Sequence, residues 1–334
     1  MGVFMILFTI IGAIIGAGFA SGQEIYLFFY RFGINGIYGI IICNIIMTFI
    51  IYKTLKITYE KNISTYKEFL NTIFKENIFL ANIMNIIINI FLCVTFFIML
   101  SGFGAYISQR LDINIIIGSS ILAIICYIVF LKNIESLTKI NSIIIPILIF
   151  VILIIGLKNS LNINCTEISN EKGIFWSVQA ILYASYNLIL VEPVIVSLKD
   201  FIKSKKQIKI TSIITGIIMT ILSIMEFLLL ANIENFERLE MPLVNVIENK
   251  YQNFSKIYGI IILIAIFTTA VSVGIGFLNN ICKNKKSFPQ IGAILCISGV
   301  IISPIGFSNL VANLFPLFGF LGLIQIIYIF KSKY

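Results

Sequence analysis

The sequence predicts an all-α polytopic membrane protein with ten transmembrane helices, because of its composition, its charge content and the length of its apolar runs. Of 334 residues, 59% are hydrophobic and 12% are charged, whereas a soluble domain carries about 25% charged residues. A soluble fold of this size has too little interior to bury so much apolar surface. The apolar residues also gather into runs near the roughly 20 residues that a helix needs to cross a hydrocarbon core.

Ten such runs follow one another, separated by polar segments or turn residues. We interpret them as one transmembrane domain, 1–334, with five spans in the half 1–160 and five in the half 165–334. The predicted spans are 2–31, 33–57, 78–108, 113–131, 139–157, 173–198, 208–231, 254–281, 288–303 and 307–330.

The lysines and arginines indicate which side of the membrane each connector occupies. If the N-terminus is inside, the inner connectors and termini hold 17 of the 24 basic residues and the outer connectors hold 7. Because cytoplasmic loops carry the excess of positive charge, we expect both termini in the cytoplasm. The net charge of +9 then reflects topology, and the expected surroundings are the lipid bilayer and not nucleic acid.

The first span is poorly suited to being one continuous helix. Between Gly12 and Ile25 it reads GAIIGAGFASGQEI, which combines four glycines with serine, glutamine and glutamate. Each glycine weakens a helix by about 1 kcal/mol relative to alanine, so we predict an interruption here. The main-chain groups that an interruption exposes must find partners in the protein or in a ligand. The alternative is close helix packing, since Gly12–Gly16 and Gly18–Gly22 are both GxxxG pairs.

The sixth span, which opens the second half, carries a similar polar stretch. It reads FWSVQAILYASYNLILVEP and places Tyr183 to Asn187 in mid-membrane, followed by Glu192 and Pro193. We predict a second interruption in this span. Five spans per half is an odd number, so the halves would have opposite orientations, as in an inverted repeat. Two interrupted helices at matching positions of such a repeat indicate a central binding site.

The motif GAIIGAGFA resembles the first-helix motif of the amino acid–polyamine–organocation (APC) superfamily of transporters, whose members share the five-plus-five inverted repeat called the LeuT fold. The longer run GAGFASGQEI, together with SYN in span six, is similar to the YkvI family of bacterial membrane proteins. The resemblance covers essentially the whole chain, although the span-six match is looser. It therefore implies a LeuT-like architecture with helices one and six interrupted.

The resemblance also implies where ligands bind. The amides of Ala17, Gly18 and Phe19 would face a substrate carboxylate, and the carbonyls of Gly12 and Ile15 would hold sodium, the one cofactor expected. Span eight, LIAIFTTAVSVGIGF, would complete the cation site with a stripe formed by Ala265, Thr268, Thr269 and Ser272. Hydroxyls on membrane helices also often hydrogen-bond simply to neighbouring helices.

Further candidates for substrate contact lie next to the predicted interruptions and on span three, which lines the central site in this fold. They are Ser21, Glu24, Tyr183, Tyr186, Asn187 and Asn89.

Three carboxylates lie within the predicted spans, at Glu24, Glu192 and Glu226. An ionised glutamate in lipid is costly, so each should face the protein interior or a water-filled cavity. We expect Glu24 and Glu192 to bind a proton or a cation; a hydrogen-bonded structural role is the alternative, and the more expected one for Glu226. Lysine and arginine do not occur deep within the spans, which favours a positive partner from outside the chain.

The outer connector 232–253 contains MPLVNVIENKY, whose apolar residues are spaced as in a short amphipathic helix. We predict that it covers an outer vestibule as a lid, although a plain connector would show the same pattern.

Together these observations predict a secondary active transporter of a small solute, an amino acid or related amine, that works by alternating access coupled to sodium or protons. The chain has no histidine and no Walker motif for ATP hydrolysis, so we do not expect an enzyme. A non-transporting receptor for a small nutrient is the main alternative, and it would need a protein partner that the sequence does not identify. A passive channel is a third.

Overall fold

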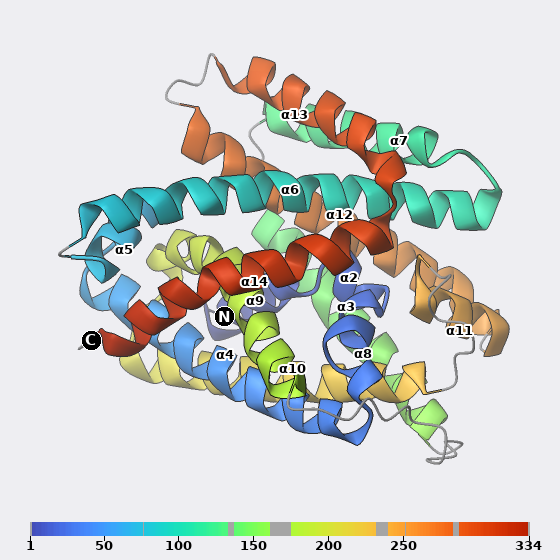
Figure 1. Cartoon of the computed structure of the whole chain (residues 1–334), viewed down its shortest axis with the longest axis horizontal. Helices are drawn as coiled ribbons and strands as arrows, with labels where there is room; N and C mark the ends of the chain where they lie inside the picture. The colour runs from blue at the N-terminus through green and yellow to red at the C-terminus, as the bar shows by residue number, and fades with distance from the viewer. Residues whose placement is uncertain are drawn as a thin grey trace.

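The computed structural model describes residues 2–75, 77–132, 137–160, 175–231, 240–250, 252–282 and 287–332. Regular structure in these ranges is helical throughout (Figure 1). The helices are α1 Gly2–Ile14, α2 Ala17–Ala20, α3 Gln23–Phe28, α4 Ile34–Glu60, α5 Tyr66–Ile73, α6 Ile78–Leu111, α7 Ile115–Lys132, α8 Leu137–Ser160, α9 Phe175–Ser197, α10 Lys205–Leu230, α11 Pro242–Lys250, α12 Gln252–Ile281, α13 Phe288–Ile302 and α14 Phe307–Lys331, with short 3-10 turns between some of them.

The long helices have the composition of membrane spans. Within the described ranges, seven helices are long and apolar enough to cross a bilayer: α4, α6, α9, α10, α12, α13 and α14. Three shorter apolar helices, Gly2–Ile14, Ile115–Leu131 and Ile145–Lys158, lie where spans one, four and five were predicted. Large apolar side chains also cover the outer surface, as at Ile301 and Phe320, which are 72% and 67% exposed. Helices that are apolar on the outside as well as the inside identify a polytopic membrane protein.

The helices of the two halves have matching neighbours. In the first half α1 contacts α8, α4 contacts α9, and α6 contacts α7 and α14. In the second half α9 contacts α14, α10 contacts α1, and α12 contacts α13 and α8. Each predicted span of one half corresponds to the span five places away in the other half. Exchanging corresponding helices turns every contact of the first set into one of the second. Figure 1 shows two of the pairs that link the halves, α7 beside α13 and α4 beside α10.

Span one is interrupted, as predicted. α1 ends at Ile14, α2 covers four residues from Ala17, and α3 starts at Gln23 after a second turn. The second turn requires glycine, because Gly22 has φ +82°, in the left-handed region, and a Cβ there would lie 2.6 Å from Leu243 Cγ. The glycine-rich sequence therefore breaks this helix twice.

The predicted interruption of span six is wrong. α9 runs without a break from Phe175 to Ser197 and includes Pro193 near its end. The physical reason is that the helix from Phe175 to Ser197 contains no glycine. Its polar groups are accommodated within the helix, since the Asn187 amide donates to the Tyr183 carbonyl one turn earlier at 3.1 Å. Pro193 removes only the helical bond to the Ile189 carbonyl.

Two short helices lie at opposite ends of the bundle, α5 at one end and α11 at the other (Figure 1). α11 confirms the short helix predicted within the connector 232–253, of which residues 232–239 lie outside the described residues. The C-terminal end of α14 lies at the α5 end of the bundle. The two ends of the bundle are therefore built differently, with α5 at one end and α11 at the other.

The sequence analysis did not predict α5, although its start carries a clear signal. The Thr65 hydroxyl accepts a hydrogen bond from the Glu68 amide at 3.3 Å, and Glu68 Oε2 accepts from the Ser64 and Thr65 amides at 2.9 and 3.3 Å. This reciprocal arrangement is a capping box. The same two amides hold the pKa of the Glu68 carboxyl below its ordinary value.

Replacing Thr65 by alanine should loosen α5, because losing an N-cap side chain costs about 1 kcal/mol, or about fivefold in a local opening equilibrium. Hydrogen–deuterium exchange of residues 66–73 in the detergent-solubilised protein measures this. Thr72→Ala is the matched control, since the Thr72 hydroxyl donates to the Glu68 carbonyl of its own helix at 2.7 Å and caps nothing. Equal exchange in the two variants would contradict a capping role.

Candidate functional site

The end of α1 leaves main-chain groups unpaired inside the bundle. The Ile15 amide still donates to the Ile11 carbonyl at 2.8 Å, but the Gly16 amide turns back to the Ile14 carbonyl at 2.9 Å. The carbonyls of Gly12 and Ile15 consequently have no donor among the described residues. A buried carbonyl without a partner is costly. This break is therefore a place for a ligand that donates hydrogen bonds to carbonyl oxygens or for a cation that they coordinate.

Of the predicted cation ligands on α12, Thr269 lies beside this break. Its hydroxyl is buried and has no hydrogen-bond partner in the described structure. Its methyl carbon lies 3.5 Å from where a Cβ on Gly16 would stand. The Thr268 hydroxyl instead donates to the Ala265 carbonyl at 3.1 Å, and the Ser272 hydroxyl donates to the Thr268 carbonyl at 2.8 Å. The free hydroxyl and the unpaired carbonyls fit a small hard cation, which prefers oxygen ligands.

Glu24 lies on the other side of the break, folded back over α2. Its carboxylate accepts a hydrogen bond from the Tyr186 hydroxyl and lies within hydrogen-bonding reach of the Phe19 amide. A Cβ on Gly18 would lie 2.2 Å from Glu24 Oε1, so only glycine leaves room for this side chain. Glu24 therefore occupies the place where a substrate carboxylate was expected to meet the amides of residues 17–19.

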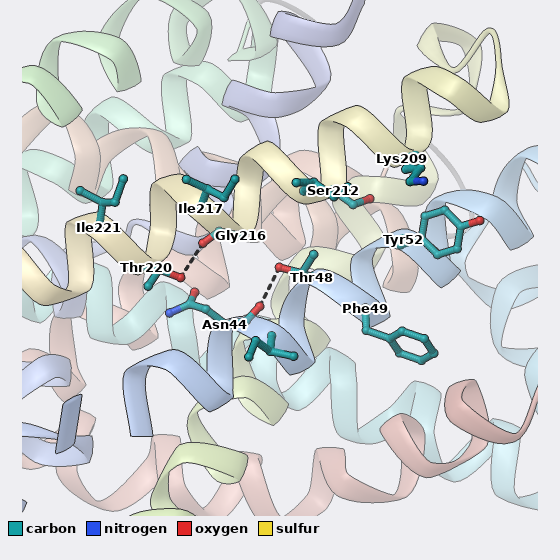
Figure 2. A pocket seen from close by; sticks show the side chains of 12 residues that line it. Asn44, Thr48, Phe49, Tyr52, Lys209, Ser212, Gly216, Ile217, Thr220 and Ile221 are labelled. Atoms are coloured by element: carbon teal, nitrogen blue, oxygen red, sulfur yellow. Dashed lines mark hydrogen bonds between the residues drawn. The ribbon is translucent and has the colours of Figure 1, made fainter. Parts of the chain in front are cut away.

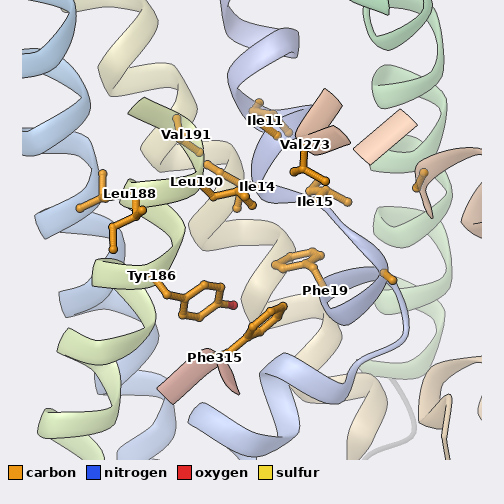
Figure 3. Close-up of a cluster of buried hydrophobic side chains, with 14 of the residues drawn as sticks. Ile11, Ile14, Ile15, Phe19, Tyr186, Leu188, Leu190, Val191, Val273 and Phe315 are labelled. Carbon is orange, nitrogen blue, oxygen red and sulfur yellow. The ribbon is translucent and has the colours of Figure 1, made fainter. Parts of the chain in front are cut away.

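Aromatic rings of α9 line the region around Glu24. The Tyr186 ring stacks on Phe315 of α14 with centroids 4.7 Å apart, and packs edge-on against Tyr183 at 5.4 Å. The Tyr183 hydroxyl is buried without a hydrogen-bond partner in the described ranges, although Glu24 is nearby. Figure 3 shows the rings of Phe19, Tyr186 and Phe315 together beyond the end of α1. The continuous helix α9 thus contributes side chains to the site and no open backbone.

The other predicted substrate contacts are engaged locally. The Ser21 hydroxyl donates to the Gly18 carbonyl at 3.1 Å, which stabilises the turn after α2. The Asn187 amide is bonded within α9, as described above, while its carbonyl oxygen is buried without a partner in the described structure. Asn89 donates to the Asn85 carbonyl one turn earlier at 2.8 Å, and its position on α6 is not joined to Glu24 by any observed contact in the described residues. Substrate contact by Ser21, Asn187 and Asn89 therefore stays a prediction.

A cavity of about 680 Å³ leads toward the break from the α5 end of the bundle. It is bordered by the exposed residues Ser64 and Lys67 and also by the buried Thr269 and the half-buried Ser272. Thr9 and Ala13 of α1 form another part of its wall. A small solute could therefore reach the unpaired groups from this side.

The opposite side of the break is closed by α11 and the residues before it. The Leu243 amide donates to the Ser21 carbonyl at 2.9 Å, and Gln23 Nε2 donates to the Glu240 carbonyl at 3.2 Å. Glu240 in turn accepts from the Ser308 amide at 2.7 Å, which fixes the segment to the start of α14. α11 and the residues before it therefore cover this side of the break, and the role of a lid stays a prediction.

Glu192 belongs to a separate polar cluster near the cavity, away from Glu24. Its carboxylate accepts from the Tyr66 hydroxyl at 3.2 Å and from the Gln325 amide, which also donates to the Tyr66 hydroxyl at 2.6 Å. The cluster joins α5, α9 and α14, and Tyr66 also lines the cavity. Sequence reasoning missed Tyr66 and Gln325, because nothing in the chain order indicates that these helices meet.

A second hollow of about 660 Å³ lies between α4 and α10 and has a different character (Figure 2). Exposed isoleucines that face the lipid form much of its wall, including Ile45 at 63% and Ile217 at 54% exposure. Its threonines are bonded within their own helices, Thr48 to Asn44 and Thr220 to Gly216, each at 2.7 Å. We attribute this hollow to the packing of two helices and not to solute binding.

The sequence is similar to two proteins of Bacillus subtilis (strain 168). It is 29% identical over 324 residues to the uncharacterised membrane protein YkvI, covering 95% of this chain and 92% of YkvI. The chain is therefore similar to YkvI over nearly its whole length. It is also 27% identical over 320 residues to the uncharacterised protein YyaD, covering 94% of this chain and 92% of YyaD. No family model matches the sequence.

The likeness to YkvI confirms the family that GAGFASGQEI indicated. Because it extends over nearly the full length of both chains, it concerns the whole bundle and not the first span alone. Neither relative has a substrate in its name, so the chemistry of the site has to be argued from the geometry of this YkvI-like chain.

Substituting Gly18 by alanine should push the Glu24 carboxylate off the Phe19 amide and away from Tyr186, since the new methyl group would overlap it. Overpacking of this kind costs about 1–3 kcal/mol, which a lowered melting temperature in detergent would report. Gly16→Ala is the matched control, because a Cβ there meets Met99 and Thr269 at an ordinary 3.5 Å. Identical melting of the two variants would show that Glu24 does not lie over Gly18.

Proposed function

We propose that this protein is a secondary active transporter that binds a small solute at the break in span one. The observation that carries the proposal is the position of the break, between a cavity on one side and a closed lid on the other. Alternating access requires a central site that is reachable from one side while the other is sealed. The arrangement corresponds to a cavity-open, lid-closed state of such a cycle.

The matching neighbours of the two halves support an inverted repeat of five plus five spans, and with it membership of the APC superfamily. The proposed fold departs from the expected pattern in one respect, because α9 is continuous. Only the first half therefore supplies open main-chain groups. The equivalent span of the second half supplies the Tyr183 and Tyr186 side chains.

An amine end of the solute suits this site better than a carboxylate end. Glu24 is buried, 3% exposed, and already lies against Gly18 and the Phe19 amide. A solute carboxylate would have to displace it, whereas a solute ammonium could pair with it in place. We therefore propose an amino acid or related amine whose cationic group contacts Glu24 and whose apolar part contacts the tyrosine rings.

The driving force in this proposal is an ion gradient. Thr269, with the unpaired Gly12 and Ile15 carbonyls, supports a sodium site at the break. Glu24 and Glu192 support protons as the alternative, since a membrane carboxylate is a common proton carrier. Sodium bound at the break would satisfy the orphaned carbonyls and so favour the solute-binding conformation.

Replacing Thr269 by valine should reduce the stimulation of solute uptake by sodium at least tenfold. Valine keeps the shape of the threonine side chain and removes its free hydroxyl. The assay is accumulation of radiolabelled amino acids and amines in proteoliposomes, with sodium or pH gradients. Thr268→Val is the matched control, since its hydroxyl is used within α12.

Unchanged sodium stimulation in Thr269→Val would rule out this sodium site. Solute binding without accumulation under any gradient would overturn the proposed transport function and favour a nutrient receptor.

In this proposal both termini are cytoplasmic and the cavity faces the cytoplasm. Lys67→Cys, at the cavity mouth, should react with a membrane-impermeant maleimide only in inside-out vesicles. Asn309→Cys, an exposed position beside the lid anchor at Ser308, should react in intact cells. Both variants are made in a background without the native cysteines. Reversed labelling would place the cavity on the outer side.

A further inference from the structure

Glu226 of α10 is a buried carboxylate that the proposed solute and sodium sites do not use. It is 0% exposed. Neither of its two oxygens has a hydrogen-bond partner among the described residues. Leaving an ionised carboxylate buried without a donor or a cation costs several kcal/mol, so this side chain calls for a positive partner.

The packing of α10 on α3 directs Glu226 toward Glu24. Leu230 lies one turn after Glu226 on the same helix face and reaches within 3.2 Å of where a Cβ on Gly22 would stand. Phe227 packs on Tyr30 at the other end of the α3 segment, with ring centroids 5.2 Å apart. Glu226 therefore faces α3 between these two contacts, and its carboxylate interacts electrostatically with that of Glu24.

The other titratable groups around Glu226 carry no positive charge. Tyr183 of α9 interacts electrostatically with both carboxylates, and Tyr258 of α12 interacts with that of Glu226. The Tyr258 hydroxyl is already used in donating to the Ala20 carbonyl. The described part of α8 that packs on α10 ends in Lys158, whose ammonium lies over the Phe254 ring. Two carboxylates therefore share a region without a cation from the described chain.

We propose that Glu226 and Glu24 form a proton-binding pair beneath the lid, holding one proton between them. A protonated Glu226 donates a hydrogen bond to a Glu24 oxygen, which removes one charge and satisfies one oxygen of each residue. Two carboxylates that share a site bind a proton as a pair for this reason. Glu24 remains the acceptor for the Tyr186 hydroxyl.

In the solute-free protein, a proton fits between these two carboxylates better than a metal ion does. Glu24 and Glu226 are 3% and 0% exposed, and neither lines the two cavities described above. A proton needs no added volume, whereas a hydrated ion does. Loss of the proton would make the two carboxylates repel, and Leu230 transmits that change to Gly22, directly under Leu243 of the lid.

A role of this pair in coupling protons to transport rests on the proposed transport function. The bound proton itself can be detected without any solute. Infrared spectra of the purified protein in nanodiscs at pH 7 should contain the C=O absorption of a protonated carboxylic acid. Glu226→Gln should abolish the Glu226 component, because an amide side chain cannot hold the proton. Glu226→Asp should keep it, and Glu24→Gln should shift it, since the proton then faces an amide.

Glu192→Gln is the matched control, because Glu192 lies in the separate cluster with Tyr66 and Gln325 and its loss should leave the Glu226 component intact. Size-exclusion profiles identify any variant that fails to fold, and Glu226→Asp then decides the result. An unchanged spectrum in Glu226→Gln overturns the pair. Loss of the wild-type component on replacing choline chloride by sodium chloride would assign the site to sodium and also overturn it.

Discussion

The loss of main-chain hydrogen bonds where α1 ends, at Ile14 to Gly16, is the constraint on which the rest of the structure depends. A carbonyl without a donor is inexpensive in water and costs several kcal/mol in hydrocarbon. The break must therefore lie inside the bundle, where α6, α9 and α12 surround it. The need to enclose these groups and yet leave a ligand access to them accounts for the cavity on one side and the lid on the other.

The two halves of the bundle resolve this constraint differently. The first half opens its leading helix at glycines, so main-chain groups face the centre. The second half keeps its leading helix α9 intact and brings polar atoms to the centre on side chains, those of Tyr183 and Tyr186. A matching set of helix neighbours therefore coexists with an asymmetric site. The break therefore contributes main-chain groups from one half, and a continuous helix contributes aromatic side chains from the other.

Buried carboxylates occur at two levels of the bundle. Glu192 is held by donors from α5 and α14 near the cavity, so its cluster joins helices that must separate if this side closes or opens further. Glu24 and Glu226 lie beneath the lid, where Leu230 and Leu243 both contact Gly22. One polar cluster lies near the cavity and the other lies beneath α11. A change of charge in one cluster would therefore alter the packing of helices that also contact the other cluster.

The sequence by itself determined the membrane fold, the approximate spans and the break in span one. Long apolar runs allow no soluble structure, and the glycines of GAGFASG favour an open helix in any context. Glu24 follows that break directly in the sequence, whereas Thr269 was assigned to it only through the resemblance to APC transporters. The capping box of α5 was readable from Thr65 and Glu68, although it lay outside the spans considered.

Only the tertiary structure decided which polar side chains meet. The continuity of α9 depends on the absence of glycine together with local bonding of Asn187, so its polar stretch alone was misleading. The partners of Glu192 and Glu226 come from helices distant in the chain, and contacts between such helices are set by packing that a one-dimensional pattern does not contain. Periodicity identifies which face of a helix is polar, but the opposing helix determines what that face contacts.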